Sequence, residues 1–377
     1  MVRLLQLPGG DELYRYRKSL VVAFRGPRKV LSTGPNNGGY RTDLQAVFNH
    51  DCNPDSGERV ELKTENYREY MDVCAREKLG LDPKSCTGLA TAASMDHVSI
   101  QTMTYEDFSV TAIVTGGIEV NGGRVGDVAE WHEKDEVSYP VKMGTINIIL
   151  CIDADLSESA LVRAMITCTE AKTAVLQELL ASSRYSRGIA TGSGTDGTIL
   201  VCNAASEVHL TNAGKHCKLG EYIGKTVKTA VKEALELHTG LNGSLQHDAI
   251  RRMERFGVTD EAVWACYLEQ TKTSMEEKAV FMKQLEQKKT ESELVIYTSL
   301  YAHLLDQFDW GLLDAQEVWK AGKELLHLAG METSYDEKIL ENEWEKEEWF
   351  EWLVERYRKG LAQLVSKDCS IDKKQVL

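Results

Sequence analysis

The chain has 377 residues, of which 42% are hydrophobic and 27% charged, enough to bury one large core or two ordinary ones. Its formal net charge of -14 excludes a nucleic-acid groove or an anionic membrane surface as the main partner, because both would repel it. The nine cysteines form no Cys-x-x-Cys pair, and no apolar run approaches the roughly 20 residues of a membrane span. We therefore expect a cytoplasmic protein with reduced thiols and no membrane association.

The first 240 residues predict a mixed α+β domain. Short β-branched runs, punctuated by Gly, Asn or Asp, indicate strands near residues 19–24, 29–33, 44–48, 88–93, 99–104, 109–117, 144–152 and 198–203. Helical spacing indicates helices over residues 67–80, 155–180 and 221–240. The second of these opens with an Asp155-x-x-Glu158 capping pattern, and the other two end at a glycine.

The character of the chain changes after Gly240. Strand-like runs almost disappear, and six of the seven tryptophans lie in this final part. Amphipathic helices are expected over residues 260–270, 293–307, 314–330 and 341–365. The apolar residues of the last helix have the spacing of a core face: Trp344, Trp349, Trp352 and Leu353. We place the boundary near Leu241 and expect an all-helical module, residues 241–377, docked on an α+β domain of residues 1–240.

Two glycine-rich stretches stand out within the α+β domain. Residues 191–197, TGSGTDG, hold three hydroxyl side chains, three glycines and one aspartate. Such a stretch forms either a turn or a cradle of backbone N–H groups for an anion or a developing oxyanion, and taken alone it favours the turn. Residues 121–127, NGGRVGD, begin with Asn-Gly, which is typical of a tight hairpin turn.

One lysine is predicted to face the core. Lys172 falls within the apolar stripe of the helix over residues 155–180, so its ammonium either extends past the apolar edge or requires a buried carboxylate. Glu170 lies roughly 200° around the same helix and is expected at the surface. The stripe itself consists of Leu161, Met165, Cys168, Val175 and Leu179.

A third polar group precedes the helix over residues 221–240. Lys215, His216, Lys218 and Glu221 gather where that helix should begin, and a helix N-terminus attracts anions. His216 is a candidate general acid or base, although a lone histidine is more often simply hydrogen-bonded. The nine histidines have no metal-ligand spacing, so we expect no metal.

Several motifs, in order from about residue 30 to residue 238, together resemble the adenosylcobinamide amidohydrolase family, CbiZ-type. They are VLSTGPNNGGY, GLATAASMDHVSI, VNGGRVGD, GTINIIL, TEAKTAVLQEL, RGIATGSGTDGTILV and AGKHCKLGEYIG. The resemblance implies hydrolysis of the amide that joins aminopropanol to the corrinoid ring, giving adenosylcobyric acid for corrinoid salvage. The corrinoid would be a small-molecule substrate rather than a cofactor, and no cofactor is implied. The usual loop is closer to ATGTGTD, so Ser193 is a conservative departure.

A second, weaker resemblance concerns the fold of the first domain. Residues 144–166, followed by a helix and by residues 191–205, are similar in pattern to the β-aminopeptidases of the DmpA type. That likeness implies a layered α/β/β/α sandwich. The self-cleaving serine or threonine of those enzymes has no clear counterpart here.

The family resemblance turns the TGSGTDG stretch into an expected active-site loop. Oxyanion donors would be the backbone amides near Gly194 to Asp196, together with Asn121. Asp196 or Glu170 would be the base and His216 or Lys172 the proton donor, while Thr195 or Ser193 could instead act as a covalent nucleophile. The other residues expected to bind substrate are Gly122, Gly123, Lys215 and Glu221. A corrinoid-binding protein without hydrolytic activity, or an amidase acting on another large ligand, remains the alternative.

Overall fold

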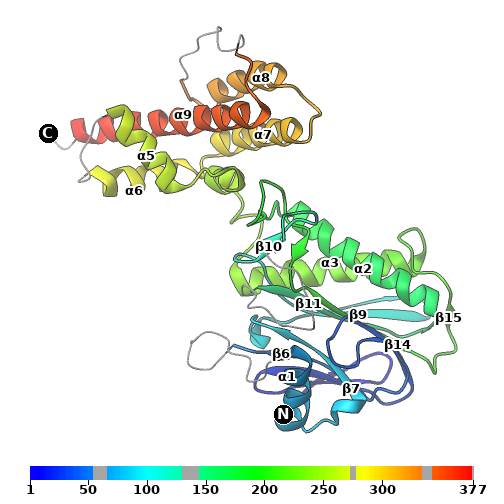
Figure 1. Ribbon diagram of the computed structural model, residues 1–377. Coiled ribbons are helices and arrows are strands. Elements are labelled where there is room, and N and C mark those ends of the chain that lie inside the picture. Colours follow the sequence, from blue (N-terminus) through cyan, green and yellow to red (C-terminus); the bar gives the residue numbers. More distant parts are fainter. Residues whose placement is uncertain (54–65, 130–143, 272–276, 333–341, 376–377) are drawn as a thin grey trace. The chain divides into compact units, whose positions relative to one another are not determined.

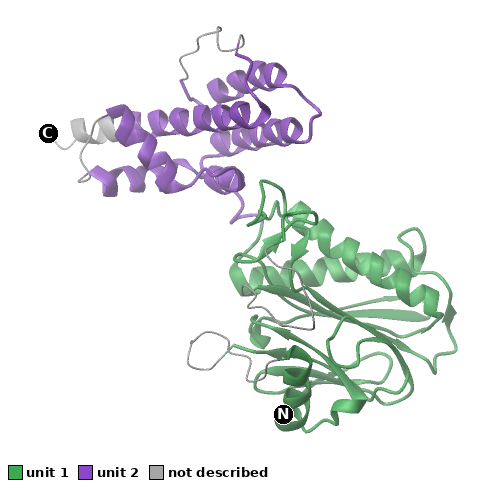
Figure 2. Cartoon of the chain, viewed as in Figure 1, with its two compact units in different colours: residues 1–242 green, residues 243–377 purple. Residues whose placement is uncertain are grey.

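The computed structural model describes residues 1–53, 66–129, 144–271, 277–332 and 342–375. The chain separates into two compact units, residues 1–242 and 243–377, shown in Figure 2. The sequence alone placed this division near Leu241. No helix among the described residues is long and apolar enough to cross a membrane.

The first sheet of unit 1 has five strands in the order β1-β2-β3-β6-β7. Neighbouring strands are antiparallel except β6 and β7, which are parallel. Val47 of β6 and Leu89 of β7 belong to the core between the two sheets, whereas Phe48 packs on the other face, as the two-residue period of a strand requires. The strands are β1 (Val2–Gln6), β2 (Glu12–Arg15), β3 (Ser19–Ala23), β6 (Ala46–Asp51) and β7 (Cys86–Thr91).

The second sheet has six strands in the order β5-β4-β14-β11-β9-β8. β11 and β14 are parallel and the other neighbours are antiparallel. Every residue of β9 and β11 is buried, because these central strands are covered on both faces. The strands are β4 (Arg28–Ser32), β5 (Gly39–Arg41), β8 (Ser99–Tyr105), β9 (Phe108–Gly117), β11 (Thr145–Ile152) and β14 (Gly197–Asn203). Two short ladders join β10 (Gly122–Gly123) to β13 (Gly192–Ser193) and β12 (Asp155–Leu156) to β15 (His209–Leu210).

Helices cover the outer face of each sheet (Figure 1). α2 (Glu158–Glu178) and α3 (Lys218–Thr239) pack on the second sheet, and α1 (Tyr67–Val73) with the π-helix η1 (Cys74–Leu79) packs on the first. An apolar layer that includes Leu13, Val47, Ile113 and Ile149 fills the space between the sheets. Unit 1 is therefore an α/β/β/α sandwich, which confirms the predicted fold class. Short 3-10 turns are η2 (Pro83–Ser85) and η3 (Met95–His97).

The start of α2 differs from the predicted capping pattern. Ser157 is the N-cap, and its hydroxyl accepts from the backbone N–H of Ala160. Asp155 instead lies in β12, where it forms an ion pair with Lys29 and a hydrogen bond with Nδ1 of His209. The Asp155-x-x-Glu158 pattern thus located the start of the helix but not its capping residue, because a serine can cap a helix as well as an aspartate can.

Unit 2 is helical, as predicted, and has a core of its own. Its helices are α4 (Ala249–Met253), α5 (Asp260–Thr271), α6 (Lys278–Lys288), α7 (Ser292–Asp309), α8 (Ala315–Leu328) and α9 (Lys346–Gln375), with a 3-10 turn η4 (Glu254–Phe256). Trp349 and Leu353 of α9 are buried in this core, and Trp344 and Trp352 pack against it. The prediction that these side chains belong to the core is confirmed. Docking on unit 1 remains a prediction.

Gly88 of β7 is expected to tolerate no side chain. A Cβ there would overlap the ring of Phe48, which is fully buried. Gly88→Ala should therefore lower the free energy of unfolding by about 1–3 kcal/mol. The matched control is Gly224→Ala in α3, where a Cβ would meet nothing within 4 Å and the lower helix entropy cost should stabilise by about 0.5–1 kcal/mol. Urea unfolding followed by circular dichroism checks both, and equal effects at the two glycines would contradict the packing argument.

Candidate active site

At one end of the sandwich the inner faces of the strands become polar. On β9, Thr115 and Gly117 follow Ile113 on the same face, and on β11, Asn147 and Thr145 precede Ile149. The same change occurs on β6, where Asn49 follows Val47. We call Asn49, Thr115, Thr145 and Asn147 the polar end; all four are buried. Buried polar side chains in this position must satisfy one another or a ligand.

The polar end connects the two sheets through side-chain amides. Asn147 Nδ2 donates to Asn49 Oδ1 at 2.8 Å and to the carbonyl of Ala90 at 2.9 Å. Asn49 Nδ2 in turn donates to Thr115 Oγ1 at 2.8 Å. Thr145 Oγ1 donates to the carbonyl of Thr195 at 2.7 Å, which ties the polar end to the glycine-rich loop. A network of this kind fixes side chains in one arrangement.

Asp196 fastens the loop of residues 191–197. Its Oδ1 accepts from the backbone N–H of Ile146 at 2.8 Å and from Ser193 Oγ at 2.7 Å. Its Oδ2 accepts from the backbone N–H of Ser193 at 3.0 Å and from Lys172 Nζ. Four donors thus occupy the lone pairs of the carboxylate. This arrangement is typical of a positioning residue, and the role of Asp196 as the base stays a prediction.

Lys172 is the buried partner of that carboxylate. Its side chain is 11% exposed and that of Asp196 is 12% exposed, so the ion pair is shielded from bulk water. The prediction that Lys172 faces the core is confirmed. A Cβ at Gly192 would overlap the Asp196 carboxylate and lie 2.6 Å from Lys172 Nζ, so a glycine is required where the loop crosses the pair.

The two glycine-rich stretches form a single structure. Gly122 pairs with Ser193 and Gly123 with Gly192 in the β10–β13 ladder. Tight turns are present at this stretch, as predicted, since the N–H of Asn121 donates to the carbonyl of Ile118 and that of Asp127 to the carbonyl of Arg124. They do not close a local hairpin, because Gly122 and Gly123 pair with a segment distant in sequence. Asn121 Nδ2 donates to the carbonyl of Gly144 at 2.8 Å, and its Oδ1 accepts from the hydroxyl of Tyr185 at 3.0 Å.

The tip of the loop presents backbone to solvent. Gly194 and Thr195, at the tip of the loop, are exposed. The two hydroxyls proposed as nucleophiles are engaged within the protein: Ser193 Oγ donates to Asp196, and Thr195 Oγ1 donates to the carbonyl of Gly144 at 2.9 Å. The loop thus presents exposed backbone at its tip, while the hydroxyls beside the tip are held by hydrogen bonds.

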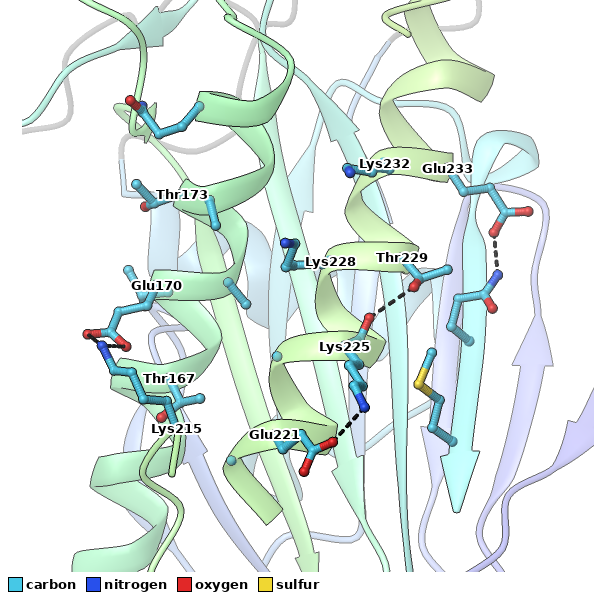
Figure 3. Close-up of a pocket in the computed structure, with 18 of the residues that line it drawn as sticks. Thr167, Glu170, Thr173, Lys215, Glu221, Lys225, Lys228, Thr229, Lys232 and Glu233 are labelled. Carbon is cyan, nitrogen blue, oxygen red and sulfur yellow. Dashed lines mark hydrogen bonds and ion pairs between the residues drawn. The ribbon is translucent and has the colours of Figure 1, made fainter. Parts of the chain in front are cut away.

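Four other predicted site residues lie on the outer face of the helix layer. Glu170, Lys215 and Glu221 line an open groove of about 1270 Å³ between α2 and α3, drawn in Figure 3. Glu170 is exposed, as predicted, and pairs with Lys215 at 2.9 Å. His216 is also exposed, in the segment before α3. The structure does not bring these four residues together with Asp196, because Lys172 faces the sheet while Glu170 faces outward from the same helix.

The groove carries balanced charge. Each lysine lining it forms an ion pair with a glutamate: Lys215 with Glu170, Lys225 with Glu221, and both Lys228 and Lys232 with Glu178. Exposed pairs of this kind are typical of a solvated helix surface. We therefore place the candidate active site at the polar end and its loop, and not in the groove.

A pair of histidines beside the polar end was missed by the sequence reasoning. Nδ1 of His97 and Nδ1 of His238 are 3.1 Å apart. His97 lies inside a segment that carried the family resemblance, GLATAASMDHVSI, which was a usable signal. Its partner lies 141 positions away, and nothing in the sequence indicates that contact. No group of three or more His, Cys, Asp or Glu side chains that could hold a metal ion occurs within the described part of the chain.

The sequence of unit 1 matches known proteins over most of its length. Residues 4–243 match the family model described as adenosylcobinamide amidohydrolase. An uncharacterized protein of Methanocaldococcus jannaschii is 36% identical over 236 residues, which are 60% of this chain and 88% of that protein. The adenosylcobinamide amidohydrolase of Methanosarcina mazei is 32% identical over 232 residues, 58% of this chain and 96% of that protein.

Among solved structures, the L-aminopeptidase D-Ala-esterase/amidase of Ochrobactrum anthropi aligns with a TM-score of 0.28 and 10% identity, over 60% of this chain and 83% of that one. This similarity is too low to inform the fold, which rests on the layers described above.

Proposed function

The chain belongs to the adenosylcobinamide amidohydrolase family, and from that premise we propose that it hydrolyses the amide joining aminopropanol to the corrinoid of adenosylcobinamide. Water adds to the carbonyl carbon, the C–N bond breaks, and aminopropanol leaves with a proton, giving adenosylcobyric acid. The corrinoid is the substrate, and we propose no cofactor and no metal. The Methanosarcina mazei relative, which bears the name of this activity, supports the proposal over nearly its whole length.

The observation in the structure that carries the proposal is the exposed tip of the loop, Gly194 and Thr195, on a backbone that is held at several points. Hydrolysis of an amide places negative charge on the carbonyl oxygen, and a preorganised donor stabilises that charge without reorganisation. The Asp196–Lys172 pair, the β10–β13 ladder and the Thr145–Thr195 hydrogen bond all hold this loop. We assign Asp196 and Lys172 to positioning, and the Gly194 N–H to the oxyanion.

The test is incubation of the full chain with adenosylcobinamide and mass analysis for adenosylcobyric acid. Gly194→Pro removes the N–H and should lower kcat/KM about 10²–10³-fold. Gly194→Ala keeps the N–H, and its Cβ would lie 4.0 Å from Asn121 Oδ1, an ordinary van der Waals contact, so this variant should stay close to wild type.

Each alternative function has its own outcome in this assay. Binding of adenosylcobinamide without any product would support a corrinoid-binding protein. Product from another large amide, with adenosylcobinamide left intact, would support an amidase of different specificity. Equal activity in the two Gly194 variants would remove the loop from the mechanism.

A further inference from the structure

Two imidazoles form a pair next to the polar end. His97 is the last residue of η3, and His238 lies in the last turn of α3. Their Nδ1 atoms are 3.1 Å apart, so one ring donates and the other accepts. Because this contact occupies Nδ1 of each ring, Nε2 is the nitrogen that each ring can offer to another group. Both side chains are half-buried, which leaves them accessible.

His238 Nε2 points to the end of β9. A Cβ at Gly117 would lie 2.5 Å from His238 Cδ2 and 3.0 Å from Nε2, so only glycine allows the ring to approach this closely. Gly117 pairs with Thr145 across the sheet, and the preceding residue, Gly144, accepts hydrogen bonds from Asn121 and Thr195. The imidazole and the glycine-rich loop therefore meet at the same pair of strand ends.

The surroundings of His238 favour a neutral ring. Burial lowers the pKa of His238, and His97 lowers it further, whereas Glu119 and Asp51 act in the opposite direction. The other charged groups nearby are engaged: Asp96 pairs with Arg15, and Glu233 accepts from Ser99 and Gln101. Within the described chain Nε2 of His238 has no hydrogen-bond partner. It carries the lone pair that can take a proton in the tautomer whose Nδ1–H donates to Nδ1 of His97.

We propose that His238 transfers the proton during amide hydrolysis, with its Nδ1–H donating to Nδ1 of His97, which holds the ring and leaves the lone pair on Nε2. As the oxygen of water bonds to the carbonyl carbon, Nε2 takes one proton from that water. When the C–N bond breaks, the same proton passes to the leaving nitrogen, so the products are the carboxylic acid and the amine. Water is the only co-reactant. This inference rests on the proposed hydrolysis and adds the proton-transfer group that the loop lacks.

The test measures kcat/KM against pH for the full chain with adenosylcobinamide. His238→Gln should lower kcat/KM about 10²–10⁴-fold, the range for a positioned acid or base. His97→Ala removes the neighbouring ring that disfavours protonation, so the pKa of His238 should rise and the acid limb should move to higher pH. His303→Gln is the control, because that side chain is exposed on α7, and its profile should match wild type. Circular dichroism and thermal unfolding confirm that each variant is folded.

The possible failures are distinguishable. A wild type that forms no product overturns the proposed function and this inference with it. An active wild type accompanied by a folded His238→Gln variant within threefold of its kcat/KM overturns only the role of His238. An unshifted acid limb in folded His97→Ala overturns the coupling of the two rings. A purely structural pair would lower stability without moving the acid limb.

Discussion

Asp196→Asn is expected to lower the free energy of unfolding by about 3–5 kcal/mol, because it leaves the buried ammonium of Lys172 without its counter-charge. From sequence alone the change looks nearly neutral for folding, since Asn has almost the shape of Asp. The ion pair reverses that expectation. The amide also offers one acceptor oxygen where the carboxylate has two, so donors from Ser193, Ile146 and Lys172 compete for it.

Urea unfolding at neutral pH measures the effect. The double variant Lys172→Met with Asp196→Asn removes both charges and should recover much of the lost stability. Turnover per folded molecule should fall in the single variant, because the loop that presents the Gly194 N–H loses its anchor. If the single variant is as stable as wild type, the ion pair does not hold the loop.

Arg28→Met should destabilise the chain by a similar amount, about 3–5 kcal/mol, and leave the chemistry intact. The side chains of Arg28 and Asp11 are 3% and 5% exposed, and they form two parallel hydrogen bonds of 2.8 Å. The guanidinium also donates to the carbonyls of Pro27 and Gly9 and to Asn203 Oδ1. Arg28 thus joins the two sheets beside Asn203, at the opposite end of β14 from Gly197.

The measurement compares stability with turnover per folded molecule. Arg41→Met is the matched control, since the pair of Arg41 with Asp43 lies at the surface, where solvent screens it, and should change stability little. Unchanged turnover in folded Arg28→Met, beside reduced turnover in Asp196→Asn, would place the chemistry at the polar end. A large loss of turnover in Arg28→Met would place it elsewhere.

Much of the fold follows from local pattern. Alternating and continuous apolar runs predicted the central strands β9 and β11, and helical spacing predicted α2 with Lys172 turned inward. The edge strand β1 was not predicted, because it is short and largely exposed and so has no apolar face to detect. In unit 2, α6 was not predicted because only Phe281 and Leu285 of its described side chains are buried.

The site was less predictable because its contacts join distant segments. Spacing shows that Lys172 faces inward but cannot show that Asp196 meets it 24 positions later. His216 was a candidate general acid or base because it lies beside a helix N-terminus, yet its side chain is exposed. His238, in contrast, lies in the last turn of α3, next to Gly117 and the polar end. One signal was available: Asn49 and Asn147 occupy inward positions of apolar strands, where a polar residue demands a partner.

The order of strands in the second sheet has a consequence for biosynthesis. Chains emerge from the ribosome N-terminus first, and the first sheet is complete once residue 91 has been made. The pairing of β4 with β14 forms much later, because Arg28 can contact Asn203 only after 175 further positions have been translated. Until then the edge of β4 that will pair with β14 stays open, with Val30 and Leu31 uncovered on a nascent chain. The topology, rather than the stability of the finished fold, therefore makes the closure of that edge a late step in folding.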